Sequence, residues 1–428
     1  MAPTVRPDDT SPAPPPAPRP PTARPLPALL LTALLATAAC AGPGDGTAED
    51  NRPPADTGSA SPAPHGHVEG ARETAEQQSR LLLNDPDSGS TQVLDLITGQ
   101  AHDTAPVRDA VRIGTDGRFG FLHTGEGVRV LDTGAWTVDH GDHVHYYRAD
   151  LKDIGELPAG EAAQVRGDTA VTAVTDDRGR AALYRRADWE AGRTGTARPL
   201  PGTYTVPVVP FAGHLVALVA DDGGGAARLV ALDRAGQRAE VPDAECAEPA
   251  GDAVTRRGVV LACAEGALLV GERDGALTVD EIPYGEPVPE GERAADFRYR
   301  PGGDTLAAPA GDDAVWVLDV GEKTWTRVET GPFVAVNTAG EGSPLLVLAP
   351  DGTLRGFDLA DGEQLARTER LVTPGAEVAP VIEVDRSRAY VNDPLGRRVL
   401  EIDHHDRLRV ARTFPLDIAP RLMTETGR

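Results

Sequence analysis

Basic side chains, aromatic side chains and cysteine are all scarce in this sequence. Lys and Arg number 42 against 66 Asp and Glu, which gives a formal net charge of −24 at pH 7, and the basic residues form no patch. Nucleic acids and anionic lipid surfaces are bound by concentrated positive charge, so the sequence argues against both as partners. Hydrophobic residues still make up 40% of the 428 residues and aromatics only 4%, which excludes wholesale disorder and predicts a core of Val, Leu and Ala.

The apolar run near the N-terminus is too short to span a bilayer as a helix. It covers Leu26 to Ala39, follows a Pro- and Arg-rich leader, and ends in small residues directly before Cys40. This order is typical of a secretory signal peptide, which we place at residues 1–39. Its end resembles a bacterial lipobox, in which the cysteine is lipidated and becomes the new N-terminus, although Thr37 stands where the pattern prefers Leu. We expect an extracytoplasmic lipoprotein anchored through Cys40, with a freely secreted protein as the alternative.

Apart from Cys40, the chain contains only Cys246 and Cys263. An even pair of cysteines in an exported chain predicts one disulfide. A metal-binding thiolate pair is the competing interpretation, and it is weaker because the separation of 17 residues lacks the close spacing that presents two thiolates to one ion.

Residues 40–75 predict a flexible linker behind the lipidated cysteine. From 41 to 63 the sequence is mainly Gly, Pro, Ser, Thr, Asp and Ala, with no periodic apolar face that could pack. His65 and His67 lie near the end of this linker. We place a single folded domain at residues 76–428.

Beyond residue 80 the sequence shows no long helical pattern and instead repeats a short β unit. A short apolar strand closes on an acidic or polar residue and is followed by a turn, eight times, with an average spacing of about 44 residues. The markers of the repeat are Asp95, Asp132, Arg185, Asp233, Glu272, Asp319, Asp358 and Asp403. This period predicts an all-β protein with the fold of a β-propeller of eight blades, or of seven if the Arg185 unit is not one. A β-sandwich or two smaller β domains is the structural alternative.

Three of the ten histidines, His140, His143 and His145, fall within six residues. Side chains alternate between the two faces of a strand, so His143 and His145 are expected to project to the same side, close enough to bind one ion. Asp139 shares their face if the strand extends back that far. His140 joins them, together with Asp142, if the glycine between those two residues introduces a bulge or turn.

Imidazole and carboxylate ligands suit zinc or copper better than calcium or magnesium, which prefer oxygen alone. Copper(I) is disfavoured because no thioether or thiolate lies nearby, so we predict a Zn²⁺ site. The competing interpretation is a solvated, His-rich strand end whose imidazoles bond to neighbouring carboxylates. His65 and His67 repeat the same spacing in the linker, where binding should be weaker and faster to exchange, as in a tail that collects or passes on the ion.

Several segments together resemble the AztD-type zinc metallochaperones. They are HGHVEGA, TVDHGDHVHYYRA, CAEPAGDAVTRRGVVLACAEGALLV and AYVNDPLGRRVLEIDH, of which the DHGDHVHYY stretch is the specific one. The resemblance implies a β-propeller that hands zinc to the solute-binding protein of a zinc ABC importer. It implies that His140, His143 and His145 belong to the zinc site or border it, and that His65 and His67 form the tail motif.

The sequence departs from this family where further histidines are expected. PGTYTVPVVPFAG contains Tyr204 and no histidine, His214 follows it, and CAEPAGDAV contains no histidine. Glu248, Asp252 or Asp142 could replace the missing ligands.

The favoured hypothesis is a non-catalytic, monomeric zinc-binding protein attached to the membrane only through its lipid. The alternative is a propeller lipoprotein that binds a protein or cell-wall ligand without metal. The sequence contains no G-x-S-x-G nucleophile elbow and no H-E-x-x-H motif, which argues against a hydrolase.

Overall fold

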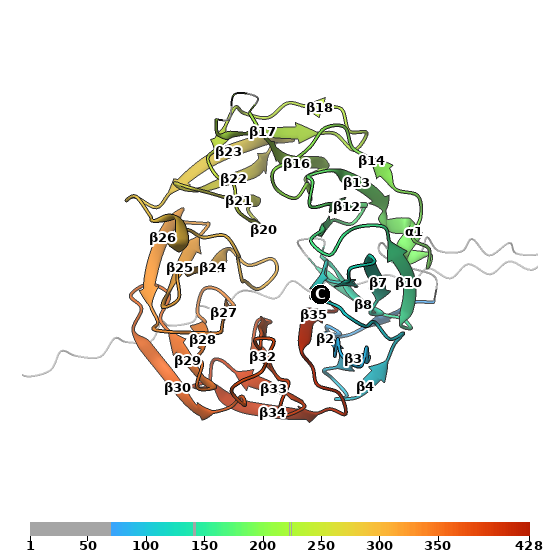
Figure 1. The fold of residues 1–428 in the computed structure, drawn as a ribbon, viewed down its shortest axis with the longest axis vertical. Helices are drawn as coiled ribbons and strands as arrows, with labels where there is room; N and C mark the ends of the chain where they lie inside the picture. The colour runs from blue at the N-terminus through green and yellow to red at the C-terminus, as the bar shows by residue number, and fades with distance from the viewer. Residues whose placement is uncertain (1–69, 140–142, 222, 224) are drawn as a thin grey trace, which may run out of the picture. The chain divides into compact units, whose positions relative to one another are not determined.

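Runs of Val, Leu and Ala form short strands that fold back on one another as antiparallel sheets. The computed structural model of the protein describes residues 70–139, 143–221, 223 and 225–428. Within these residues, eight sheets follow one another around a ring, which Figure 1 shows along its axis. The ring is a β-propeller, and its blades are numbered here in ring order from the one that closes it.

The first four blades contain the strands from β2 to β19 that form the ring, together with the C-terminal strand in blade 1. Blade 1 contains β35 (Leu422–Thr426), β2 (Arg80–Asn84), β3 (Thr91–Asp95) and β4 (Ala101–Asp103). Blade 2 contains β5 (Arg112–Thr115), β6 (Phe119–His123), β7 (Val128–Asp132) and β10 (Lys152–Leu157). Blade 3 contains β11 (Gln164–Gly167), β12 (Val171–Thr175), β13 (Ala181–Arg185) and β14 (Arg198–Pro199). Blade 4 contains β15 (Val209–Phe211), β16 (His214–Val219), β17 (Ala227–Leu232) and β18 (Arg238–Ala239), with β19 (Glu245–Cys246) also paired to β17.

The last four blades complete the ring. Blade 5 contains β20 (Asp252–Val254), β21 (Val259–Cys263), β22 (Gly266–Arg273) and β23 (Ala276–Pro283). Blade 6 contains β24 (Thr305–Ala310), β25 (Ala314–Asp319) and β26 (Thr324–Glu329), and a single bridge from Arg298 to Ala307 lies on its inner side. Blade 7 contains β27 (Ala335–Thr338), β28 (Leu345–Leu348), β29 (Thr353–Phe357) and β30 (Gln364–Arg370). Blade 8 contains β31 (Ile382–Val384), β32 (Arg388–Asp393), β33 (Arg398–Asp403) and β34 (Arg409–Pro415).

The all-β propeller fold predicted from the repeat is confirmed, with eight blades in the described residues. Each of the eight sequence markers lies in, or directly after, the strand before the outermost strand of its blade. The Arg185 unit, whose status separated eight blades from seven, is blade 3. Helix is limited in these residues to α1 (Arg186–Glu190) and the 3₁₀ turn η1 (Glu290–Glu292).

The ring closes through the C-terminal strand. β35 pairs along its whole length with β2, from Leu422 opposite Asn84 to Thr426 opposite Arg80. Gly427 then donates a main-chain hydrogen bond to Gly117 in blade 2, at 2.7 Å. The first blade is therefore built from both ends of the ring-forming sequence, which covers the sheet edges that an open array would expose.

The core lies between the blades. Each pair of neighbouring blades shares one cluster of buried apolar side chains, and the cluster between blades 2 and 3 centres on Trp189. Complete burial of a Val or Leu side chain contributes about 1.5–3 kcal/mol, so each contact between blades is stabilised by many such residues.

A disulfide joins blades 4 and 5. Cys246 ends β19, which pairs with blade 4, and Cys263 ends β21 of blade 5. Their sulfurs are bonded, and the two Cα atoms lie 5.2 Å apart. Among the residues that the structure describes, none belongs to a helix long and apolar enough to cross a bilayer.

Candidate metal centre

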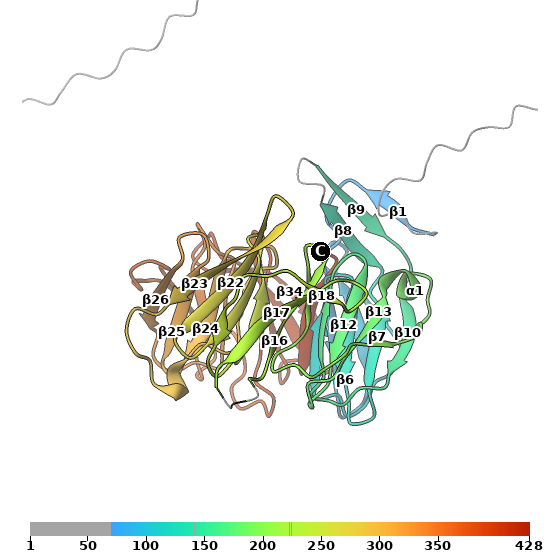
Figure 2. The ribbon, with the colours of Figure 1, turned by 90° about the horizontal axis from the view of Figure 1, so that it is seen from above.

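One additional hairpin interrupts the regular order of the blades. β8 (Ala135–Asp139) and β9 (Val144–Arg148) are inserted between β7 and β10 of blade 2, and β1 (Arg72–Thr74) adds a third strand on β9. Figure 2 shows this small sheet standing on one face of the ring. The strand β1 lies within the segment expected to be linker, so ordered structure begins before residue 76.

The base of the hairpin is rigidly packed. Gly134 has a φ of +68°, and a Cβ atom there would lie 2.4 Å from the carbonyl oxygen of Ala149, so the sharp entry into β8 requires glycine. The Arg118 guanidinium, itself 1% exposed, lies 3.6 Å from the ring centre of Trp136 and is bonded to Asp132 at 2.7 Å. A cation over an aromatic ring and a buried ion pair together fix the orientation of this base.

The hairpin brings His143 and His145 together. Tyr147 is stacked on Trp136 with ring centres 5.4 Å apart, and His145 follows Tyr147 at 6.2 Å on the same face of the strand. The rings of His143 and His145 then lie side by side, with centres 4.9 Å apart and an angle of 84° between their planes. The two imidazoles therefore extend a row of rings from the buried base towards the exposed tip.

Glu73 is a functional candidate that the sequence reasoning missed. Its Oε1 lies 2.7 Å from Nδ1 of His145, and the side chains of Glu73 and His145 are 50% and 26% exposed. Glu73 stands opposite Tyr147 in the pairing of β1 with β9, and its charge adds to burial in raising the pKa of that tyrosine. No local pattern predicts this contact, because it joins residues 72 positions apart.

Asp139 is placed differently from the prediction. It stands opposite Val144 in the pairing of β8 with β9, whereas His145 stands opposite Val138. Asp139 therefore points to the other face of the hairpin from His145. The expectation counted positions along one continuous strand, but the chain reverses direction between Asp139 and His143.

Several predicted residues lie outside the described part of the chain. These are His140 and Asp142 of the histidine cluster, His65 and His67 of the tail, Cys40, and the signal peptide at 1–39 with most of the linker at 40–75. Within residues 70–139, 143–221, 223 and 225–428, no three His, Cys, Asp or Glu side chains are grouped so that they could hold a metal ion. The described part of the candidate centre is thus the His143–His145 pair with Glu73 behind it.

The acidic residues considered as replacement ligands hold arginines instead. Asp252 accepts two hydrogen bonds from Arg166, at 2.6 and 2.9 Å, and Glu248 is paired with Arg293 at 2.6 Å. Tyr204 is buried and donates its hydroxyl hydrogen bond to the carbonyl of Pro201.

Three of the remaining histidines lie away from the hairpin. His123 is 3% exposed at the end of β6, where burial and the neighbouring Arg112 lower its pKa to about 3. His404 and His405 lie in the turn after β33, where the alternation of strand side chains does not apply, and their ring centres are 4.4 Å apart. His102 is exposed in β4, and Nδ1 of His214 lies 2.9 Å from the carbonyl of Ala212.

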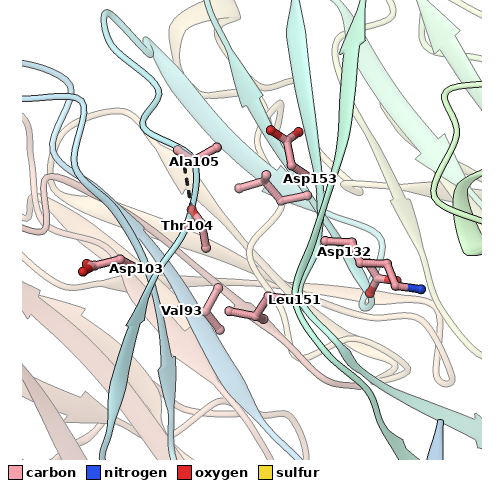
Figure 3. Close-up of a pocket in the computed structure, with 9 residues that line it drawn as sticks. Val93, Asp103, Thr104, Ala105, Asp132, Leu151 and Asp153 are labelled. Carbon is pink, nitrogen blue, oxygen red and sulfur yellow. Dashed lines mark hydrogen bonds between the residues drawn. The ribbon is translucent and has the colours of Figure 1, made fainter. Parts of the chain in front are cut away.

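A small pocket of about 130 Å³ lies between blades 1 and 2, and Figure 3 shows its lining. Its carboxylates do not converge: Asp103 accepts a hydrogen bond from Gln92 at 2.8 Å, Asp132 binds Arg118, and Asp153 binds Arg129. The carboxyl groups of Asp103 and Asp153 point in different directions. The carboxylates that line this pocket are therefore not arranged as a cluster of metal ligands.

Comparison with known proteins supports the resemblance found in the sequence. The chain is 22% identical to the zinc chaperone AztD of Citrobacter koseri over 360 residues, which cover 76% of this chain and 81% of that protein. It matches a crystal structure of Citrobacter koseri AztD with a TM-score of 0.66 and 19% identity, covering 82% of this chain and 98% of that one. An apo structure of that protein gives a TM-score of 0.65 with the same identity and coverage. No protein-family model matches. The resemblance to AztD-type proteins is confirmed as a divergent one.

Proposed function

We propose that this protein is an extracytoplasmic zinc carrier, which holds Zn²⁺ at the inserted hairpin and passes it to the solute-binding protein of a zinc ABC importer. The observation that carries the proposal is the pair of imidazoles of His143 and His145, 4.9 Å apart on a rigidly based hairpin. The similarity to a zinc chaperone over 76% of the chain supports zinc as the ion.

The contact with Glu73 supports a metal-binding role for His145. A histidine that binds a metal through one ring nitrogen usually donates the hydrogen of its other nitrogen to a carboxylate or carbonyl. The bond from Nδ1 of His145 to Glu73, at 2.7 Å, holds the ring in one orientation, and we propose Nε2 as the nitrogen that binds the metal. His143 supplies the second imidazole.

Zinc takes four ligands, or three protein ligands and one exchangeable position. We propose that His140 and Asp142, in the segment between β8 and β9, complete the shell together with water. Asp139, which points to the other face, is not part of this set.

Transfer requires a site that a partner can reach. His143 is exposed at the outer end of the hairpin, and His145 is partly exposed. A partner histidine could therefore enter the shell from the tip and replace the hairpin ligands one at a time. We propose that His65 and His67 collect the ion first, because β1, which follows them closely in sequence, is paired directly to the histidine-bearing strand β9.

We further propose that Cys40 is lipidated after removal of residues 1–39, which keeps the carrier at the outer side of the cytoplasmic membrane. Handling of the ion by ligand exchange needs no catalytic group, so the protein is proposed to have no enzymatic activity.

Zinc titration of the purified protein tests the central claim. The His143→Ala/His145→Ala double variant should lose one equivalent of tightly bound zinc, whereas His102→Ala/His214→Ala, which also removes two histidines, should retain it. An unchanged stoichiometry in the first variant would reject the hairpin as the site. If that variant still bound its protein partner with full affinity, metal-independent recognition would be the better account.

A further inference from the structure

A groove of about 590 Å³ runs across blades 6, 7 and 8. It is lined by turns that follow β25, β29 and β33, which are the strands before the outermost strand of each blade. The inserted hairpin follows the equivalent strand β7 of blade 2. Because the strands of every blade alternate in direction in the same order, the groove and the hairpin open on the same face of the ring. Ligand pockets commonly enclose roughly 300–1,000 Å³, so the groove has room for a small molecule.

Part of the lining of the groove is apolar. It includes Leu408, which is buried, Leu359, which is partly buried, and Leu365 from β30, which is 55% exposed. Water covers an exposed leucine at a cost in free energy. This surface favours a ligand with aliphatic side chains.

His404 is a buried imidazole without a good partner on this surface. It is 4% exposed, and neither of its ring nitrogens makes a well-formed hydrogen bond in the described residues, although the main chain of Asp385 lies close enough to act on the ring. Burial lowers the pKa of His404, with a further contribution from His405, whereas the Asp385 main chain acts in the opposite direction. A neutral imidazole presents one N–H donor and one acceptor. A buried polar group without a good partner destabilises the folded state, and a ligand that supplies an amide N–H or carbonyl would satisfy it.

The charged residues that line the groove are separated by blade: Asp319 belongs to blade 6, Glu341 and Asp358 to blade 7, and Arg407 to blade 8. Asp319 of blade 6 and Asp358 of blade 7 are held by their turns, since each accepts a main-chain hydrogen bond, from Glu322 at 2.9 Å and from Ala360 at 2.8 Å. The opposite end is basic.

That basic end is the turn of blade 8, which contributes Arg407; Nε2 of His405 in the same turn lies 3.2 Å from the carbonyl oxygen of Arg386. Arg409, the first residue of β34, is paired with Asp406 at 2.6 Å, whereas Arg407 forms no ion pair within the part of the chain that the structure describes. A ligand spanning the groove would therefore meet carboxylates at one end and an arginine at the other.

We propose that this groove binds short zwitterionic peptides with apolar side chains. The peptide ammonium lies at Asp319 and Asp358, its terminal carboxylate lies at Arg407, and its side chains pack on the leucines. A backbone amide of the peptide pairs with His404. This site is separate from the zinc centre, because it uses other blades and needs no metal.

Calorimetric titration of the full protein, without zinc, with the dipeptide Leu-Leu tests the proposal. Leu-Leu should bind with a Kd below about 1 mM. Acetylation of its amino group, or amidation of its carboxyl group, should each weaken binding about tenfold or more, because each removes one charge-assisted contact. No detectable binding of Leu-Leu, or equal binding of all three peptides, would overturn the proposal.

Matched variants locate the site. Arg407→Ala should abolish the difference between Leu-Leu and its amide, whereas Arg409→Ala at the start of β34 should preserve it. Leu365→Asn should weaken binding at least fivefold, roughly as expected for one lost leucine contact, whereas Leu395→Asn, at another leucine that is 56% exposed, should not. Equal effects in either pair would reject the groove as the binding site.

His404→Leu separates binding from a structural role. The substitution removes the unpaired nitrogens and should raise the melting temperature, while it weakens Leu-Leu binding. A stabilised protein that binds Leu-Leu as before would show that His404 does not contact the ligand and would reject the assigned pose. Zinc stoichiometry should be unchanged in all of these variants, so failure here leaves the zinc proposal standing and the reverse also holds.

Discussion

Replacement of Glu73 by alanine removes the group that orients His145 without removing any proposed zinc ligand. Loss of such a partner behind a metal ligand typically costs about 10–100-fold in metal affinity. The Glu73 side chain is 50% exposed and that of His145 is 26% exposed, so water can partly replace the lost hydrogen bond. We therefore expect a loss of affinity at the lower end of this range. The predicted loss is about tenfold, equivalent to about 1.4 kcal/mol.

Glu73→Gln should give an intermediate effect. Its amide oxygen can still accept the hydrogen bond from Nδ1, but bonds to a charged acceptor are about twice as strong as those between neutral groups. About half of the free energy should therefore be lost, which corresponds to about threefold in affinity. The order wild type, glutamine, alanine distinguishes orientation by a carboxylate from a simple packing role.

Competition with a chromophoric zinc chelator at fixed pH measures these affinities, because protons compete with zinc for the imidazoles. The control is Glu76→Ala, which removes an exposed carboxylate of similar charge just beyond β1. The strand itself should stay docked in all variants, since it pairs with β9 through the main chain and Thr74 donates to the Tyr146 carbonyl at 3.3 Å. If Glu73→Ala bound zinc like the wild type while His145→Ala did not, the orienting role would be refuted.

Three further predictions concern stability. The Cys246→Ala/Cys263→Ala variant should lose about 3 kcal/mol in urea unfolding, as expected for a closed loop of this length, and a non-reducing digest of the wild type that yields both peptides as free thiols would contradict the bridge. Arg118→Met should cost about 3–5 kcal/mol, because it leaves the buried Asp132 carboxylate without its partner, and an effect below 1 kcal/mol would show that the pair is not needed at the hairpin root. Burial raises the pKa of Glu425 to about 7, above its ordinary value, so the folded state binds the carboxyl proton of Glu425 more tightly than the unfolded state does. The stability that this proton contributes is lost as the pH rises through the raised pKa. The urea midpoint should therefore fall from about pH 5 to about pH 8 by less in Glu425→Gln than in the wild type, and parallel pH profiles would contradict the assignment.

The repeat was the part of the fold that the sequence specified well. In each blade a polar residue lies in, or directly after, the strand before the outermost one, so one strand pattern, repeated at a regular spacing, predicted eight blades, or seven if the Arg185 unit was not one. Even Arg185, the marker that departs from the acidic pattern, ends the equivalent strand of its blade. The alternation of side chains along a strand also predicted that His143 and His145 point to the same side. Both lie on the same arm of the hairpin, and their ring centres are 4.9 Å apart.

The errors arose where the chain changes direction. Asp139 was counted on the same strand as His143, but the turn of the hairpin lies between them. Counting along the sequence therefore no longer tells which face Asp139 points to, and it pairs with Val144 rather than with His145. The contact of Glu73 with His145 could not be predicted, because the alternation of side chains along β9 does not show which distant segment pairs with the edge of that strand.

The candidate metal centre lies at the point where the repeat is broken. In a regular blade the strands pack against the neighbouring blades, and packing fixes the side chains between them. A site that exchanges an ion with a partner therefore needs structure beyond the repeat. The insertion between β7 and β10 supplies it: Arg118 packs on Trp136 at its base, and His143 is exposed at its outer end. The pairing of β1 with β9 places residues 72–74 against the same hairpin. These two departures from the propeller pattern would give the proposed carrier a firm base and an accessible tip.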